Sequence, residues 1–241
     1  MSGLNVPSLQ HLARFWHNDP QHIKRTLVSL VDNRPTFSYG PLYDAVRDLL
    51  VLHLPREQVL EGLQRAKQPI ARSSYSEILP LAYEYFEGVK PAFVQAVAPR
   101  LYPVGRDLMI PFQPPLIYGV SGNFYFPWFS FWRRNPLAGE KLSLFVTIVE
   151  EVLLQDADLE DAEFTILDFS ADSSRSSRSL KAVNTRDIPR VSERRKTEML
   201  SVFAQGFDLA STEISRRPQK PTRQVSQPLG DDQLGLFDRP V

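Results

Sequence analysis

Residues 124–132 read FYFPWFSFW, which places seven aromatic side chains in nine positions. Successive side chains of a strand point to opposite faces, so this run presents large apolar groups on both of them. A strand that is apolar on both faces is typical of a sheet covered on both sides. Pro127 cannot donate a backbone hydrogen bond, which predicts a bulge or an edge there. We therefore expect a buried strand in the core of the protein.

A second interpretation of the aromatic run follows from Arg133 and Arg134, which come directly after it. Aromatic side chains next to cationic ones are also how proteins stack the bases of single-stranded nucleic acid. Clustered aromatic residues are nevertheless more often found in the interior than on the surface. The core interpretation is therefore favoured, with base stacking as the alternative.

The chain before this run has a helical pattern. Pro20, Pro41 and Pro55 each occupy a predicted first helical turn. After each proline, apolar residues recur at the i, i+3, i+4 and i+7 spacing of a helix with one buried face. A short helical turn is expected after Gly88. The two helices that meet at Pro55 could be a DNA-binding helix-turn-helix, but a solvated charged face is the simpler interpretation.

The chain after Pro99 changes to short strands, and Ser121-Gly122-Asn123 predicts a hairpin between two of them. Asn135-Pro136 predicts the start of a central buried helix, and Ser192 the start of a last one. The expected strands cover residues 107–112, 116–120, 123–132, 164–169 and 180–184. The order predicts an α+β fold with a helical N-terminal half and a small, mostly antiparallel sheet. The expected regions are a helical one (1–98), an α+β one packed on it (99–214) and a disordered tail (215–241).

The composition is that of an ordinary globular protein of 241 residues. Its 28 basic and 28 acidic side chains give a net charge of zero, so DNA contact would need a local patch or a partner. The chain has no cysteine, which excludes disulfides, thiolate zinc sites and cysteine nucleophiles. It carries no signal-peptide pattern and no apolar run of membrane-spanning length. We therefore expect a soluble, cytoplasmic protein without a membrane partner.

The tail contains one apolar cluster in a segment rich in Pro, Arg, Gln, Ser and Asp. Residues 233–237 read Gln-Leu-Gly-Leu-Phe. A polar segment of this kind buries too little apolar surface to fold alone, and a few large apolar residues within it are typical of a peptide that orders on a partner. The alternative is that the tail folds back over an apolar patch of its own domain.

The peptide resembles the clamp-binding peptide of bacterial replication and repair proteins, whose pattern is Gln, an aliphatic residue, a small or acidic residue, Leu and Phe. The resemblance implies that Gln233 orients the peptide at the mouth of a pocket on the ring-shaped DNA sliding clamp. Leu234 would then make the first apolar contact, and Leu236 and Phe237 would fill the pocket. A second near-match, Lys141 to Phe145, lies in the predicted central helix and is explained by its apolar stripe.

The predicted order of elements is similar to that of the PD-(D/E)XK nucleases. That resemblance implies an aspartate on the second core strand and an acid-x-lysine on the third, which hold magnesium and activate water. The strand at 116–120 has no carboxylate, and the strand at 123–132 has neither acid nor lysine. We therefore expect PD-(D/E)XK-like topology without its catalytic residues, no cofactor, no metal site and no enzymatic activity.

Basic residues gather around the predicted hairpin and last helix, and this part of the chain is the best candidate for contact with phosphate. The alternative is a set of solvated charges on a hairpin and helix. The candidate phosphate contacts are Arg175, Arg178, Lys181, Arg194 and Arg195.

Together these features predict a protein that binds the bacterial DNA sliding clamp and competes with polymerase and repair partners, which inhibits DNA replication. This behaviour resembles that of a toxin from a toxin–antitoxin pair, with an antitoxin or protease adaptor as a further partner and DNA contacted indirectly or weakly. The alternative is a DNA repair nuclease or accessory factor that the clamp recruits to DNA.

Overall fold

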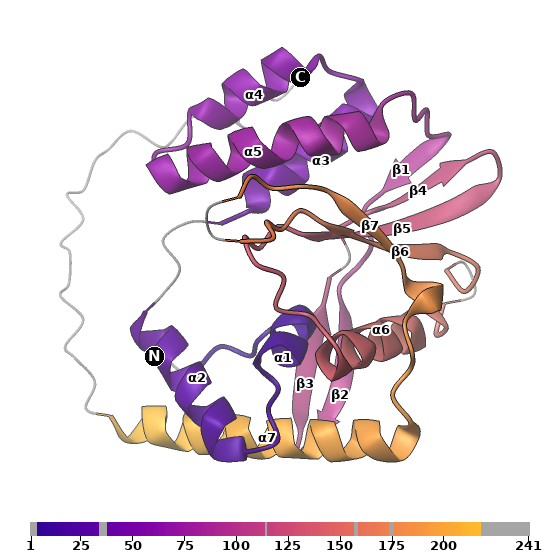
Figure 1. The fold of residues 1–241 in the computed structure, drawn as a ribbon. Coiled ribbons are helices and arrows are strands. Elements are labelled where there is room, and N and C mark those ends of the chain that lie inside the picture. Colours follow the sequence, from indigo (N-terminus) through magenta and orange to yellow (C-terminus); the bar gives the residue numbers. More distant parts are fainter. Residues whose placement is uncertain (1–3, 34–37, 114, 157–158, 174–175, 218–241) are drawn as a thin grey trace, which may run out of the picture.

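The computed structural model describes residues 4–33, 38–113, 115–156, 159–173 and 176–217. Within these residues the fold is α+β, with a five-stranded mixed sheet between two groups of helices and a separate two-stranded hairpin (Figure 1). The helices are α1 Leu9–Phe15, α2 Pro20–Asp32, α3 Gly40–Leu52, α4 Arg56–Gln64, α5 Pro69–Phe86, α6 Glu140–Leu153 and α7 Glu193–Arg216. The strands are β1 Phe93–Gln95, β2 Arg100–Gly105, β3 Leu108–Phe112, β4 Ile117–Val120, β5 Asn123–Ser130, β6 Glu163–Asp168 and β7 Lys181–Asn184.

The aromatic run forms β5, the middle strand of the sheet order β1-β4-β5-β6-β7. It pairs with β4 through an antiparallel hairpin and with β6 in parallel, and every other neighbouring pair of this sheet is antiparallel. The turn before β5 has Ser121 at φ 52° and Gly122 at φ 82°, the two positive values that a type I′ hairpin turn needs. The predicted hairpin and the mostly antiparallel sheet are confirmed.

Both faces of β5 are buried from Phe126 onward, as its composition predicts, whereas Phe124 is 38% exposed and Tyr125 is half-buried. Phe126 and Trp128 face one core, and Phe129 faces the other together with Phe131, just beyond the strand. Pro127 lies opposite Thr165 of β6 without a shift in register, while β4 pairs with β5 only as far as Tyr125. Strand β5 therefore has β6 as its one partner strand at Pro127, so the proline sits at a local edge and interrupts no ladder.

Helices α3, α4 and α5 cover one face of the sheet (Figure 1). Their apolar stripes meet side chains of β4, β5 and β6 and of the residues directly after β5 and β6, namely Tyr118, Phe129, Phe131, Leu167 and Phe169. Helices α1, α2, α6 and α7 and the hairpin β2–β3 share the core on the other face. The helical N-terminal region is thus divided between the two sides of the sheet. That division was not evident from the sequence, because the apolar residues of every helix recur at the same helical spacing and do not indicate which face of the sheet the helix covers.

The structure differs from the expected elements in four places. The segment after Gly88 holds the short strand β1 instead of a helical turn, and residues 100–105 form a strand where none was predicted. The predicted strand at 107–112 is β3, but it pairs with β2 outside the main sheet. Helix α6 begins at Glu140 and not at Asn135. The Asn135 oxygen does accept from Leu137 N as in a cap, but its amide donates to Asp168 of β6, and Gly139 at φ 54° separates this turn from the helix. Short strands and competing side-chain bonds are poorly encoded in local patterns.

Candidate functional site

The predicted clamp-binding residues Gln233, Leu234, Leu236 and Phe237 lie outside the described residues. The structure does fix where the tail begins. Helix α7 ends at Arg216, and the next residue, Arg217, donates to Asp32 Oδ1 at 2.7 Å and to Glu213 Oε1 at 3.3 Å. Asp32 is the last residue of α2. The tail therefore starts beside the C-terminal end of α2.

The second near-match to the clamp pattern, Lys141 to Phe145, lies within α6. Leu144 and Phe145, the counterparts of the anchoring pair, are both 0% exposed. Lys141 Nζ donates to the backbone oxygen of Arg14 at 2.8 Å, which joins α6 to α1. These side chains would have to leave the core before they could enter a partner's pocket, so this segment has a structural role.

Arg178, one of the candidate phosphate contacts, is a buried residue. Its Nη1 donates to the backbone oxygens of Phe131, Trp132 and Phe169 at 3.0–3.2 Å, and its Nε lies 3.6 Å from Glu77 Oε2. Its guanidinium satisfies carbonyl groups where β5 and β6 end, so it joins the two strands to α5.

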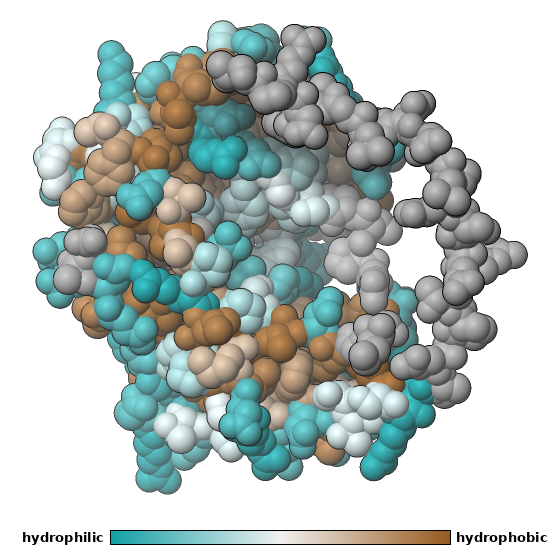
Figure 2. Space-filling view, turned by 180° about the vertical axis from the view of Figure 1, so that it is seen from behind, coloured by the Kyte–Doolittle hydropathy of each residue, from teal (hydrophilic) through white to brown (hydrophobic). Residues whose placement is uncertain are grey.

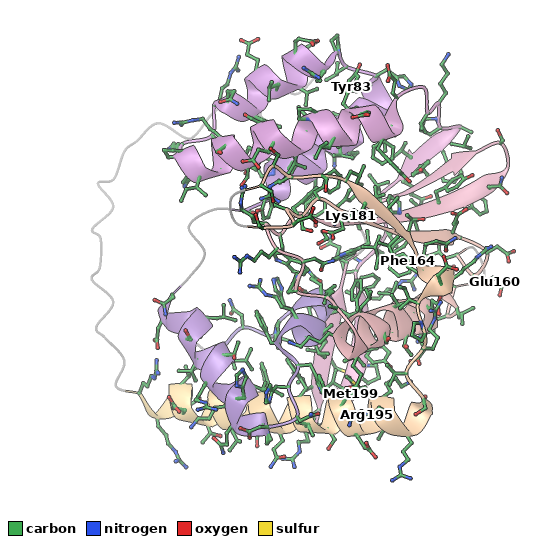
Figure 3. The ribbon with its side chains drawn as sticks, viewed as in Figure 1. Tyr83, Glu160, Phe164, Lys181, Arg195 and Met199 are labelled. Carbon is green, nitrogen blue, oxygen red and sulfur yellow. The ribbon has the colours of Figure 1, made fainter. Side chains whose placement is uncertain are left out.

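The other candidate phosphate contacts are distributed over separate elements. Lys181 begins β7 and pairs with Asp172 at 2.7 Å. Arg194 and Arg195 lie in the first turn of α7, where Arg195 bonds Glu140 at 2.7 Å and Arg194 bonds Glu198 at 3.2 Å. Lys181 and Arg195 lie far apart in Figure 3, on the sheet and on the outermost helix. Arg175 is outside the described residues. The described members therefore do not form one surface.

The strands that would carry nuclease residues contain none in the structure. Neither β4 nor β5 has an acid or a lysine. A buried carboxylate does occur one strand later, at Asp168, which accepts hydrogen bonds from Asn135 Nδ2 at 2.9 Å and from the Ser170 hydroxyl at 3.0 Å. The Asp168 carboxylate is thus held by hydrogen bonds from neighbouring side chains of the fold. Among the described residues, no group of three or more His, Asp or Glu is placed to hold a metal ion.

A pocket of 170 Å³ lies at the open edge of β5, between α1 and α3. Its lining includes His11, Tyr39, Tyr43 and Trp132, and the Tyr43 hydroxyl donates to the Phe129 backbone oxygen at 3.2 Å. Trp128 Nε1 and Ser130 Oγ, from two further lining residues, have no hydrogen-bond partner among the described residues. The lining comes from α1, the start of α3 and the end of β5, which are far apart in the chain, so sequence patterns could not reveal the pocket.

A larger groove of 520 Å³ is lined by the N-terminal segment, α1 and α2, and we refer to it as the α1–α2 groove. Its apolar lining residues are Leu4, Val6, Pro7, Phe15, Leu27, Leu30 and Val31. Its polar lining includes His11 and Arg14. Figure 2 shows apolar side chains in a band across the lower half of the molecule, below a hydrophilic hollow.

Positive charge borders the α1–α2 groove. The Arg14 guanidinium lies over the rings of Phe15 and Trp132, at 5.2 and 5.4 Å from their centroids. Burial, followed by the charge of Arg14, lowers the pKa of Lys141, and the same two causes lower the pKa of His11 to about 4. Neither Arg14 nor Lys141 has a salt bridge to a described carboxylate. This corner therefore combines apolar surface with uncompensated positive charge.

No protein-family model matches the chain, and no curated protein matches it at a significant level. Among the described helices, none has the length and apolar character to cross a membrane.

Proposed function

We propose that this protein binds the bacterial DNA sliding clamp through Gln233–Phe237. By occupying the pocket that polymerases and repair factors share, it inhibits DNA replication. The observation that carries the proposal is the five-residue match in the tail, which follows the last packed helix. The rival match in α6 is buried, so the tail is the better candidate of the two.

The tether supports this proposal. Residues 218–232 separate the end of the folded domain from Gln233 and include four prolines or glycines. A chain of this length has an average end-to-end distance of about 20–25 Å and a maximum of about 50 Å. The peptide can therefore reach a partner's pocket while α7 stays packed on α2.

The fold is consistent with a docking role in place of cleavage. In chain order, α5, β1, β4, β5, α6, β6 and β7 follow the helix and strand succession of the PD-(D/E)XK nucleases, with β2–β3 as an inserted hairpin. We propose a relationship at the level of topology. The second and third strands lack that family's acids and lysine. We therefore propose that the protein acts by binding and not as a nuclease.

A short peptide that orders on binding reaches only about micromolar affinity by itself. Strong inhibition would therefore draw on the several equivalent pockets of the ring or on contacts from the folded domain. In the proposed role the protein acts in the cytoplasm as the toxin of a toxin–antitoxin pair, with an antitoxin or protease adaptor as its second partner.

The test is clamp binding by the full chain and by Leu236→Ala/Phe237→Ala. Loss of the two anchors should weaken binding by at least about 30-fold, which is the effect of losing a single anchor that contributes about 2 kcal/mol. The control is Leu101→Ala/Met109→Ala, which removes two exposed apolar side chains from the β2–β3 hairpin and should bind like the wild type. Equal binding by the tail variant would overturn the proposal. Magnesium-dependent DNA cleavage would favour the recruited-nuclease alternative.

A further inference from the structure

The α1–α2 groove is an apolar surface that lacks an occupant among the described residues. Val6 at its rim is 42% exposed, and Leu30 and Val31 on its α2 side are half-buried. Covering such a surface is favourable by about 25 cal/mol per Å² of apolar area removed from water. A groove of this kind fits two or three apolar side chains of a short peptide.

The positive charge beside the groove indicates that the occupant of the groove carries negative charge. Arg14 lines the groove, Lys141 bonds the Arg14 backbone, and neither has an acidic partner among the described residues. A cation held over aromatic rings at a partly buried site attracts a carboxylate more strongly than a fully solvated cation does. The expected occupant is therefore an apolar peptide with acidic residues next to its anchors.

The tail begins next to this groove. The Arg217–Asp32 pair holds the first tail position against the end of α2, and Val31, which lines the groove, directly precedes Asp32. Residues 218–241 follow, and their apolar cluster at Leu234, Leu236 and Phe237 lies between acids at Asp231, Asp232 and Asp238. The tail has both the apolar anchors and the flanking acids that the groove requires, and its length exceeds the distance to be covered.

We infer that the α1–α2 groove holds the chain's own Gln233–Phe237 peptide when no clamp is present, so that groove and clamp compete for one segment. This inference rests on the proposed function and adds to it a regulation of clamp binding by the folded domain. The apolar anchors occupy the groove, and the flanking aspartates lie near Arg14 and Lys141.

Self-docking sets how tightly the full chain binds the clamp. A tether of 15 residues corresponds to an effective concentration of about 1 mM for the peptide at its own groove. If the groove alone binds the peptide with a dissociation constant of about 0.1–1 mM, the apparent clamp affinity falls by about two- to tenfold. A partner that blocks the groove would release the peptide and strengthen clamp binding.

The first experiment measures clamp affinity of the full chain with an altered groove. Val6→Glu places a negative charge at an exposed rim position, and Leu30→Glu places one deeper on α2. Both should bind the clamp about two- to tenfold more tightly than the wild type. The control is Val51→Glu, at an exposed apolar position on α3 across the sheet, which should leave affinity unchanged. Wild-type affinity in both groove variants, with the tail variant still defective, overturns self-docking and leaves clamp binding intact.

The second experiment detects the docked tail without the clamp. Because the chain has no cysteine, two can be introduced as Asn5→Cys in the groove and Asp238→Cys after the peptide. Oxidised glutathione should crosslink this pair at least about tenfold faster than the pair Val51→Cys/Asp238→Cys, because docking raises the local concentration. Adding Val6→Glu should remove the difference. Equal rates for the two pairs would refute self-docking even if clamp binding by the tail also failed.

Discussion

Gly206 of α7 lies against Ile23 of α2 so closely that a Cβ at position 206 would be 2.7 Å from the Ile23 Cβ and 2.9 Å from the Pro20 backbone oxygen. The two helices therefore meet almost backbone to backbone. This contact joins the start of the chain to the helix from which the tail departs.

Gly206→Ala should destabilise the fold, because the close atoms belong to a branched core side chain and a backbone oxygen that have little room to move. We expect a loss of about 1–3 kcal/mol in the free energy of unfolding, measured by urea denaturation. Gly62→Ala is the matched control, since Gly62 lies within α4 and a Cβ there meets nothing within 4 Å. That variant should gain about 0.5–1 kcal/mol, because alanine favours a helix over glycine.

Arg178→Ala should lower stability by about 3–5 kcal/mol, because it leaves the Phe131 and Phe169 carbonyls without their buried donor. Arg194→Ala removes a side chain that is 91% exposed and should change stability by less than about 0.5 kcal/mol. Denaturation of the two variants at neutral pH provides the comparison. A stable Arg178→Ala variant with reduced affinity for DNA would instead support a phosphate-binding role for that residue.

The pH dependence of stability should carry a contribution from His11. Burial first, and then the charge of Arg14, lower its pKa from 6.5 to about 4. The unfolded chain therefore takes up a proton at this residue below pH 6.5, while the folded chain stays neutral until about pH 4. The contribution is complete above pH 6.5 and is lost as the pH falls toward 4. From pH 7 to pH 4.5, the wild type should lose about 2 kcal/mol more than His11→Gln. Exposed His22→Gln should behave like the wild type.

The ion pair between Lys196 and Glu151 should contribute to the free energy of unfolding, because the Lys196 side chain is buried. Lys196 Nζ lies 2.5 Å from Glu151 Oε1, and the Tyr102 hydroxyl donates to Glu151 Oε2 at 2.7 Å. Burial opposes the charge of Lys196, but its bonds to Glu151 and Glu193 outweigh burial and raise its pKa. Glu151→Gln should cost about 1–3 kcal/mol in urea denaturation at pH 7, since it removes one of the two carboxylates that compensate the buried ammonium and leaves Glu193. Glu213→Gln, at a solvent-screened pair with Lys24, should leave the urea midpoint almost unchanged.

Much of the fold could be predicted from local patterns. The double-sided aromatic run gave the central strand, Ser121-Gly122 gave its hairpin turn, and Ser192 caps α7 by accepting from Arg195 N. These features depend on residues close together in the chain, whose side-chain period and turn chemistry are local properties. Strand β1 escaped prediction because its three residues are too few to show a period.

The sequence by itself determined the α+β class and the buried character of residues 126–131, and it carries the resemblance of residues 233–237 to a clamp-binding peptide, because composition, periodicity and a short linear motif are all local. Only the tertiary structure decided which residues meet. It buried Arg178 among carbonyls, placed the second near-match in the core, and put the start of the tail beside an apolar groove with positive charge. Burial and proximity arise from packing between distant segments, and no local pattern encodes them.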